Sequence, residues 1–72
     1  MIVMFYSKEG CHLCDEVMVI LDDFPCTVNI INIDHDEETF AKYHYSIPVL
    51  IIGDVTLQAP ITRGQIRAAF AT

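Results

Sequence analysis

The chain has only 72 residues, and this small size constrains its fold more than any other feature of the sequence. A chain shorter than one average domain can bury a core only if its few secondary-structure elements all share that core. Hydrophobic residues make up 53% of the sequence, which suffices for a packed core and differs from the polar composition of disordered chains. We therefore expect residues 1–72 to form a single domain, and we exclude a two-domain arrangement.

The first half of the sequence predicts a strand, a helix and a second strand. Ile2 to Tyr6 is a short apolar, β-prone run that is followed by a loop signal. From Leu13 the apolar residues recur with the spacing of a helix with one buried face, and Pro25 disfavours helical geometry at Phe24, so the helix is expected to end near Phe24. The run from Thr27 to Ile33 is rich in Val and Ile and lacks helical periodicity, which predicts a buried strand parallel to the first.

Acidic residues mark the expected start of a short second helix. Asp34 together with Glu37, or Asp36 alone, is placed to accept hydrogen bonds from the free backbone N–H groups of a first helical turn. The helix is then expected to run through Phe40 and Tyr43. The carboxylates of this stretch are expected to remain in solvent and to cap the helix.

The last part of the chain predicts a hairpin and a final helix. Val49–Ile52 and Val55–Gln58 are strand-like, and Gly53-Asp54 between them can form a tight two-residue turn. Thr62 begins a capping-box pattern, which predicts a helix through Phe70. The expected order is therefore β-α-β-α-β-β-α, an α/β fold in which helices lie on both faces of a four-stranded mixed sheet.

Charge, apolar runs and cysteine spacing limit where the protein acts and on what. The formal net charge is −6, and such a chain repels a phosphate backbone, so we expect no nucleic-acid partner. The longest apolar runs, Val17 to Leu21 and Val49 to Ile52, are too short to cross a bilayer, and the amino terminus has no signal-peptide pattern. The three cysteines are an odd number and two of them are three residues apart, unlike a secreted disulfide scaffold. We therefore expect a cytoplasmic protein with no membrane partner.

Cys11 and Cys14 stand where the first loop passes into the first helix. Residues three apart on a helical turn have Cβ atoms roughly 5–6 Å apart, so a modest adjustment brings the two sulfurs into a disulfide. Cys11 lies at the helix N-terminus, where free N–H groups and the macrodipole favour a thiolate and lower the pKa of the thiol. Cys14 lies one turn inside the helix, with less access to solvent. The pattern predicts thiol–disulfide exchange, with Cys11 as the attacking thiol and Cys14 as the resolving thiol.

Charged neighbours are expected to tune this pair. Lys8, three residues before Cys11, adds positive potential, and so does His12 when it is protonated. Both effects favour the thiolate. Asp15 and Glu16 act in the opposite direction. We expect the net result to be a lowered pKa of the Cys11 thiol.

The sequence YSKEGCHLC, followed much later by SIPVL and a hairpin, resembles the glutaredoxin-like proteins of the thioredoxin superfamily, and among them the short bacterial group. The resemblance extends over nearly the whole chain and implies a thioredoxin-like fold. It also implies that a cis peptide bond precedes Pro48, that Pro48 faces the two cysteines, and that the backbone of Ile47 pairs with a bound thiol substrate. Lys8 matches a lysine that glutaredoxins commonly place near the thiolate.

The chain departs from the glutaredoxin pattern at positions that bear on glutathione. Gln58 to Arg63 stands where glutaredoxins usually have Gly-Gly and an Asp, Tyr45 replaces a common arginine, and His12-Leu13 replaces Pro-Tyr. We expect no tightly bound cofactor, and glutathione stays a candidate co-substrate. The expected reductant is glutathione or a thioredoxin-reductase-like flavoprotein. The expected substrate is a protein or small-molecule disulfide, and the expected state is a monomer.

Two other interpretations of the cysteine pair stay open. The pair can be half of a structural zinc site, which Cys26 and one of His12, His35 or His44 would complete, although no second pair has ligand spacing. The other interpretation is a redox-inert domain that serves protein interaction. We favour the redox pair and predict no metal site. Because free cysteine is usually buried, Cys26 is expected to pack as a small hydrophobic residue.

Overall fold

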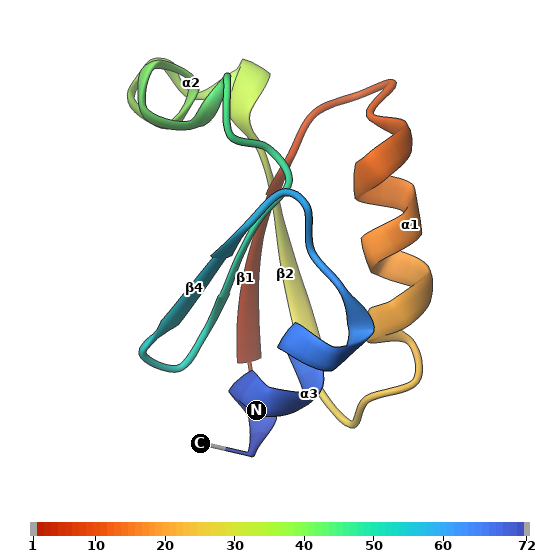
Figure 1. The fold of residues 1–72 in the computed structure, drawn as a ribbon. Helices are drawn as coiled ribbons and strands as arrows, with labels where there is room; N and C mark the ends of the chain where they lie inside the picture. The colour runs from red at the N-terminus through yellow and green to blue at the C-terminus, as the bar shows by residue number, and fades with distance from the viewer. Residues whose placement is uncertain (1, 72) are drawn as a thin grey trace.

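The computed structural model describes residues 2–71, which form one four-stranded sheet and three α-helices (Figure 1). The elements are β1 (Ile2–Ser7), α1 (His12–Leu21), β2 (Thr27–Asn32), the 3₁₀ turn η1 (Ile33–His35), α2 (Glu37–Tyr43), β3 (Val49–Ile52), β4 (Val55–Gln58) and α3 (Arg63–Phe70). This is the predicted order, with η1 added before α2. None of the helices within residues 2–71 has the length and apolar character needed to span a membrane.

The sheet has the strand order β2-β1-β3-β4. β1 runs parallel to β2, and β3 is antiparallel to both β1 and β4. A parallel pair needs a crossover connection, which α1 supplies, whereas a two-residue turn is enough to join β3 to β4. Gly53 in that turn has a φ of 57°, in the left-handed region that favours glycine. The sheet is therefore mixed, as predicted.

The two faces of the sheet bury cores of unequal size. α1 and α3 cover one face, on the right in Figure 1, and α2 lies toward the other face at the upper left. The larger core, under α1 and α3, contains the buried residues Val3, Phe5, Cys14, Val17, Leu21, Leu50, Ile52, Ile66 and Ala69. The smaller core, near η1 and α2, contains Ile33, Tyr43 and Val49. Helices thus lie on both faces, as predicted.

α1 ends at Leu21, three residues before the predicted end at Phe24. The N–H of Phe24 donates to the carbonyl of Leu21 at 3.0 Å, which is the i-to-i+3 bond of a tightened last turn. Pro25 follows, and it has no N–H with which to continue a helix. The proline signal therefore located the end of the helix to within one turn.

Side-chain caps start α2 and α3. Oδ1 of Asp36 accepts from the N–H of Glu38 at 3.0 Å, so Asp36 is the N-cap residue of α2. At α3 the capping box is complete: the N–H of Gln65 donates to Oγ1 of Thr62 at 3.2 Å, and the N–H of Thr62 donates to Oε1 of Gln65 at 2.8 Å. These bonds provide partners for backbone donors that a helix start leaves unpaired.

Candidate functional site

Cys11 and Cys14 form a disulfide at the amino-terminal end of α1. Their Cα atoms lie 5.2 Å apart, a separation typical of disulfides. Cys11 is the N-cap residue, with extended backbone angles, and Cys14 lies in the first turn of the helix. The sequence predicted both thiols at this helix start, and the structure brings their sulfurs together.

A backbone hydrogen bond reaches the sulfur of Cys11. The N–H of Cys14 donates to Sγ of Cys11, with an N···S distance of 3.1 Å. This donor is one of the N–H groups that lack an intrahelical partner in the first turn. A sulfur anion at the same position would receive both this hydrogen bond and the positive end of the helix macrodipole. The arrangement therefore favours a thiolate at Cys11 once the disulfide is reduced.

The two cysteines differ in their access to solvent. Cys14 is 4% exposed and belongs to the larger core. Cys11 is half-buried and packs against the edge of that core. A disulfide arriving from solvent therefore meets the sulfur of Cys11 first, with the sulfur of Cys14 behind it.

Lys8 and His12, the residues predicted to tune the pair, are both exposed beside it. The carbonyl of Lys8 accepts a hydrogen bond from the N–H of Cys11 at 3.3 Å, so the main chain of Lys8 helps to fix the loop. Nε2 of His12 lies 3.6 Å from Oε1 of Glu16, one turn along α1. A protonated imidazole would therefore act on the thiolate together with the opposing charge of Glu16. The tuning roles of Lys8 and His12 stay predictions.

The peptide bond between Ile47 and Pro48 is cis, as the resemblance implied. Pro48 is fully buried, and Ile47 packs against both cores. The N–H of Ile47 donates to the carbonyl of Tyr43 at 3.1 Å, so this donor is already used within the chain. The pairing of the Ile47 backbone with a substrate stays a prediction.

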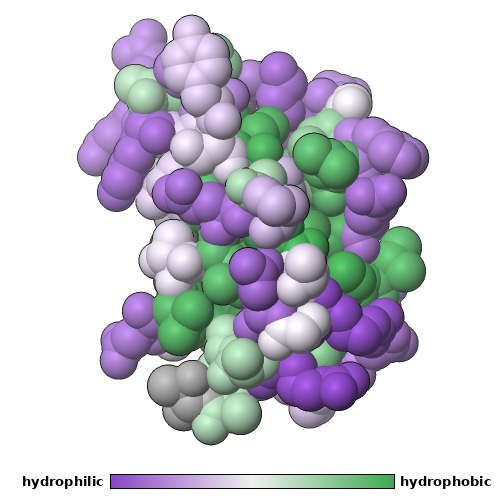
Figure 2. Space-filling model, viewed as in Figure 1, coloured by the Kyte–Doolittle hydropathy of each residue, from purple (hydrophilic) through white to green (hydrophobic). Residues whose placement is uncertain are grey.

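An apolar groove of about 390 Å³ runs between α1 and the connection from β4 to α3. Its lining residues are Leu13, Glu16, Val17, Ile20, Pro48, Ala59, Pro60 and Ile61. Figure 1 shows the β4–α3 connection descending beside α1, and Figure 2 shows apolar (green) surface in that region, with hydrophilic (purple) surface along the outer side of α1. Because Leu13 lies between the two cysteines in sequence, the groove begins at the disulfide.

Sequence reasoning did not find this groove. The helical pattern accounts for Leu13 and Val17 as a buried helix face, although Leu13 is 53% exposed in the structure. The Ala59-Pro60 bond is also cis, which the sequence analysis did not predict. The signal that could have indicated the groove is the apolar Ala59-Pro60-Ile61 at the place where glutaredoxins usually have Gly-Gly and an Asp.

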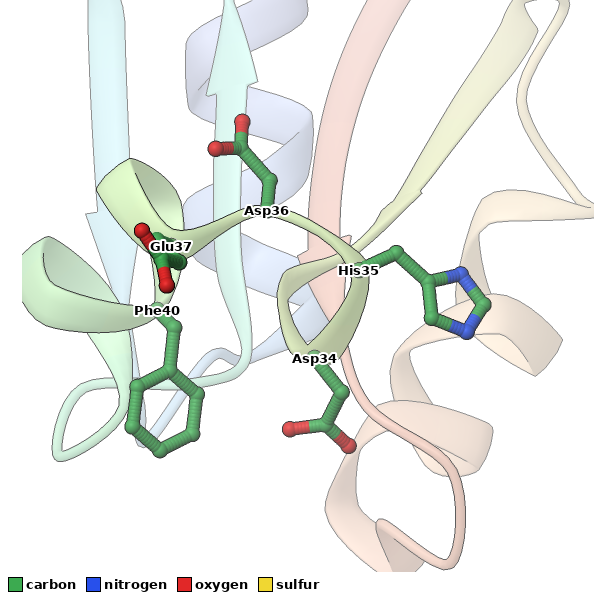
Figure 3. Close-up of a pocket in the computed structure, with 5 residues that line it drawn as sticks. All are labelled: Asp34, His35, Asp36, Glu37 and Phe40. Atoms are coloured by element: carbon green, nitrogen blue, oxygen red, sulfur yellow. The ribbon is translucent and has the colours of Figure 1, made fainter.

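The acidic stretch before α2 borders a second hollow, of about 400 Å³, lined by Asp34, His35, Asp36, Glu37 and Phe40. Figure 3 shows that the Asp34, His35 and Asp36 side chains point in different directions rather than toward a common point. Asp36 is occupied as the cap of α2. Within residues 2–71 no group of three or more His, Cys, Asp and Glu side chains is placed to hold a metal ion.

Cys26 is a free thiol, partly buried against the larger core. It follows the carboxyl end of α1, whereas Cys11 precedes the amino end. The helix between them has 10 residues and is therefore about 15 Å long. The three cysteines are thus not gathered as the zinc interpretation requires.

Together, the mixed sheet, the helices on its two faces and the cysteine pair at the start of α1 define a thioredoxin-fold protein with a redox-type CxxC site. A family model described as "Glutaredoxin-like domain (DUF836)" matches residues 2–71. The chain therefore belongs to this glutaredoxin-like family of the thioredoxin superfamily. Family membership and the paired cysteines support a thiol-redox function in general terms.

Three solved structures resemble the chain. Target protein XcR50 from X. campestris has a TM-score of 0.84 and 25% sequence identity, over 96% of this chain and 95% of that one. The glutaredoxin-like protein NrdH-redoxin from Escherichia coli, described as having a thioredoxin-like activity profile, has a TM-score of 0.66 and 23% identity, over 79% and 80%. A malarial protein has a TM-score of 0.64 and 15% identity, over 97% and 92%. The last two likenesses show the fold alone. No curated protein sequence matches the chain.

Proposed function

We propose that the protein is a thiol–disulfide oxidoreductase in which Cys11 attacks a substrate disulfide and Cys14 resolves the mixed disulfide. The observation that carries this proposal is the hydrogen bond from the N–H of Cys14 to Sγ of Cys11, at 3.1 Å. It holds a half-exposed sulfur at the helix start, directly in front of a buried one. Membership of the glutaredoxin-like family supports the same function, and the fold shared with NrdH-redoxin agrees with it.

The catalytic cycle starts from the reduced pair. The thiolate of Cys11 attacks one sulfur of the substrate disulfide, a mixed disulfide forms as the substrate S–S bond breaks, and the released thiolate takes up a proton. Cys14 then loses its proton, and its sulfur attacks Sγ of Cys11, which releases the second substrate thiol. Two electrons have passed to the substrate, and the pair is left as the disulfide seen between Cys11 and Cys14.

The residues around the pair have supporting roles in this proposal. Pro48 shapes the wall beside the disulfide, since it lines the groove that also contains Leu13. The backbone of Ile47 pairs with the substrate through its carbonyl, or through its N–H after that group has left the carbonyl of Tyr43. Lys8 and His12 contribute positive potential near the thiolate.

An external reductant must return the pair to its dithiol form. A thioredoxin-reductase-like flavoprotein or glutathione supplies the two electrons, and a protein or small-molecule disulfide accepts them. On this proposal the protein acts as a cytoplasmic monomer that needs no tightly bound cofactor, no nucleic acid and no membrane.

A turnover assay with both recycling systems tests the proposal. The purified protein is given a small aromatic disulfide, in parallel with NADPH and a thioredoxin reductase or with glutathione and its reductase. We expect turnover with at least one system. A folded protein with free Cys11 and Cys14 thiols that turns over with neither system would contradict the oxidoreductase function.

A trapping experiment tests the order of the two thiols. In Cys14→Ser the resolving sulfur is absent, so the mixed disulfide should accumulate on Cys11 and be visible as an added mass. Cys11→Ser should give no adduct, because Cys14 is only 4% exposed. An adduct on Cys14 in place of Cys11 would reverse the assigned roles, and no adduct in either variant would favour the redox-inert interpretation.

A further inference from the structure

We propose that the apolar groove binds an apolar side chain of a polypeptide disulfide and so selects protein disulfides over glutathione disulfides. The proposal rests on the oxidoreductase function above and names the substrate class of the same site. It further assigns a cationic residue to the substrate, next to the apolar residue and facing Glu16.

The walls of the groove are the first argument. Of its eight lining residues, seven are apolar and only Glu16 is charged. The volume of about 390 Å³ lies within the range of about 300–1,000 Å³ that is usual for ligand sites. Leu13 is 53% exposed in the free protein, so an apolar occupant would remove apolar surface from water on both sides, which favours binding.

The position of the groove relative to the disulfide is the second argument. Leu13 stands between Cys11 and Cys14 in sequence, and Pro48 and Ile61 belong to the same lining. Consecutive residues of an extended chain advance by about 3.3–3.6 Å. A polypeptide joined to Cys11 through its own cysteine can therefore place a residue one or two positions away in the groove.

Charge is the third argument, and it disfavours glutathione. Each glutathione unit carries two carboxylates, and within this lining they meet apolar side chains and the carboxylate of Glu16. A carboxylate placed against apolar walls without a donor loses solvation. Arg63 follows Ile61 by two residues, but its guanidinium pairs with Asp23 at 2.8 Å, beyond the other end of α1.

The same charges favour a polypeptide of particular chemistry over a second copy of this chain. Two copies would each bring a formal net charge of −6, and like charges repel. A lysine or arginine beside the apolar residue would instead face Glu16. The occupant is therefore a Cys-containing segment with neighbouring apolar and cationic residues.

Single-turnover kinetics with three matched substrates test the proposal. Each substrate is a mixed disulfide with the same coloured aromatic thiol, and the other half is blocked Gly-Cys-Leu-Lys, blocked Gly-Cys-Ser-Asp or glutathione. Reduced protein attacks the aliphatic sulfur and releases the coloured thiolate, whose absorbance gives the second-order rate constant. We expect the Leu-Lys peptide to react about tenfold faster than either other substrate, a difference that one buried apolar side chain can produce.

Charge-reversal variants identify the groove as the source of the preference. Glu16→Lys should reduce the ratio of peptide to glutathione rates by about tenfold, whereas Asp22→Lys, the same charge change at the far end of α1, should leave the ratio within about twofold. Ile61→Gln should also lower the ratio, and Val19→Gln, at an exposed apolar position outside the groove, should not. Circular dichroism establishes which variants fold, and Glu16→Lys carries the test if Ile61→Gln does not.

The outcomes separate the two proposals. If none of the three substrates reacts with folded, reduced protein, the oxidoreductase function itself is wrong. If all three react at equal rates, or if glutathione is preferred, the function stands and the groove proposal is overturned. A dimer in sedimentation equilibrium that Ile61→Gln dissociates would show a second copy in the groove and would also overturn it.

Discussion

At one end of α1 a sulfur is held within reach of solvent, whereas at the other end the helix is tied to α3. Sγ of Cys11 is half-buried and accepts a backbone N–H. At the carboxyl end, Leu21 is 1% exposed, and Phe24 just beyond it stacks on Phe70 with ring centroids 5.2 Å apart. Because packing fixes one end, the other end can present a reactive group without movement of the fold.

The same contrast separates two cysteines of this chain. Cys11 precedes α1 and meets a free N–H of the first turn. Cys26 follows α1, where its N–H donates to the carbonyl of Phe24 at 2.9 Å, and its side chain packs against the larger core. A thiol is activated by positive potential and access to solvent rather than by residue type. We therefore expect Cys11 to be reactive and Cys26 to be inert.

The largest expected effect comes from removing the reactive sulfur. Cys11→Ser should lower disulfide reduction to the uncatalysed background, because a hydroxyl cannot form the mixed disulfide. Serine is a preferred N-cap residue, so the free energy of unfolding of the reduced protein should change by less than about 1 kcal/mol. The matched variant Cys26→Ser should keep its turnover. Loss of activity in Cys26→Ser, with the fold intact, would remove the distinction between the two cysteines.

Leu21→Ala should be the most destabilising change at the anchored end of α1. Leu21 is 1% exposed in the larger core, and truncation of such a side chain costs about 2–5 kcal/mol. Urea denaturation of the reduced protein measures this loss. Val19→Ala, at a position that is 66% exposed, should cost no more than about 0.5 to 1 kcal/mol. Equal losses at the two positions would mean that this end of α1 is not held by packing.

A smaller effect is expected in the pH dependence of alkylation. The Cys14 N–H and the helix macrodipole stabilise the Cys11 thiolate, so its pKa should lie below the ~8.5 of a free cysteine. As pH falls, the alkylation rate of Cys11 should therefore decline at a lower pH than that of a model thiol. Each unit of pKa difference gives about a tenfold larger thiolate fraction below both pKa values. Reduced Cys26→Ser, labelled and mapped by mass spectrometry, reports on Cys11; a profile like that of free cysteine would contradict the helix effect.

The smallest effect is expected at the salt bridge between Asp23 and Arg63. Their side chains are 61% and 46% exposed, and exposed ion pairs contribute at most about 1 kcal/mol. Arg63→Ala should therefore lower the free energy of unfolding only slightly. A double-mutant cycle with Asp23→Ala isolates the coupling between the two charges, and added salt should reduce it. A coupling of several kcal/mol would mean that charge rather than packing anchors this end of α1.

Much of the fold could be predicted because its signals are local. Gly53-Asp54 between two apolar runs predicted the hairpin at its observed bounds, and Thr62 with its capping partner predicted the start of α3. Pro25 located the end of α1 to within one turn. Each of these signals acts through a hydrogen bond or steric contact between residues only a few positions apart, so the order of residues is enough to reveal it.

Only part of the candidate site could be predicted in this way. The positions of Cys11 and Cys14 at a helix start followed from the sequence, and the resemblance implied the cis bond before Pro48. The groove did not follow, because its walls come from α1, from Pro48 and from residues 59–61. The hydrogen bond that occupies the N–H of Ile47 likewise depends on how the chain turns after α2.

The sequence by itself determined the chemistry of this protein: two thiols of unequal access at a helix start, within a small α/β chain. The tertiary structure decided what surrounds them, since it placed the β4–α3 connection beside α1 and set Cys26 apart from the pair. The physical reason is the range of the forces involved. Capping and turn formation act between near neighbours in sequence, whereas a groove exists only after distant segments have packed on a common core.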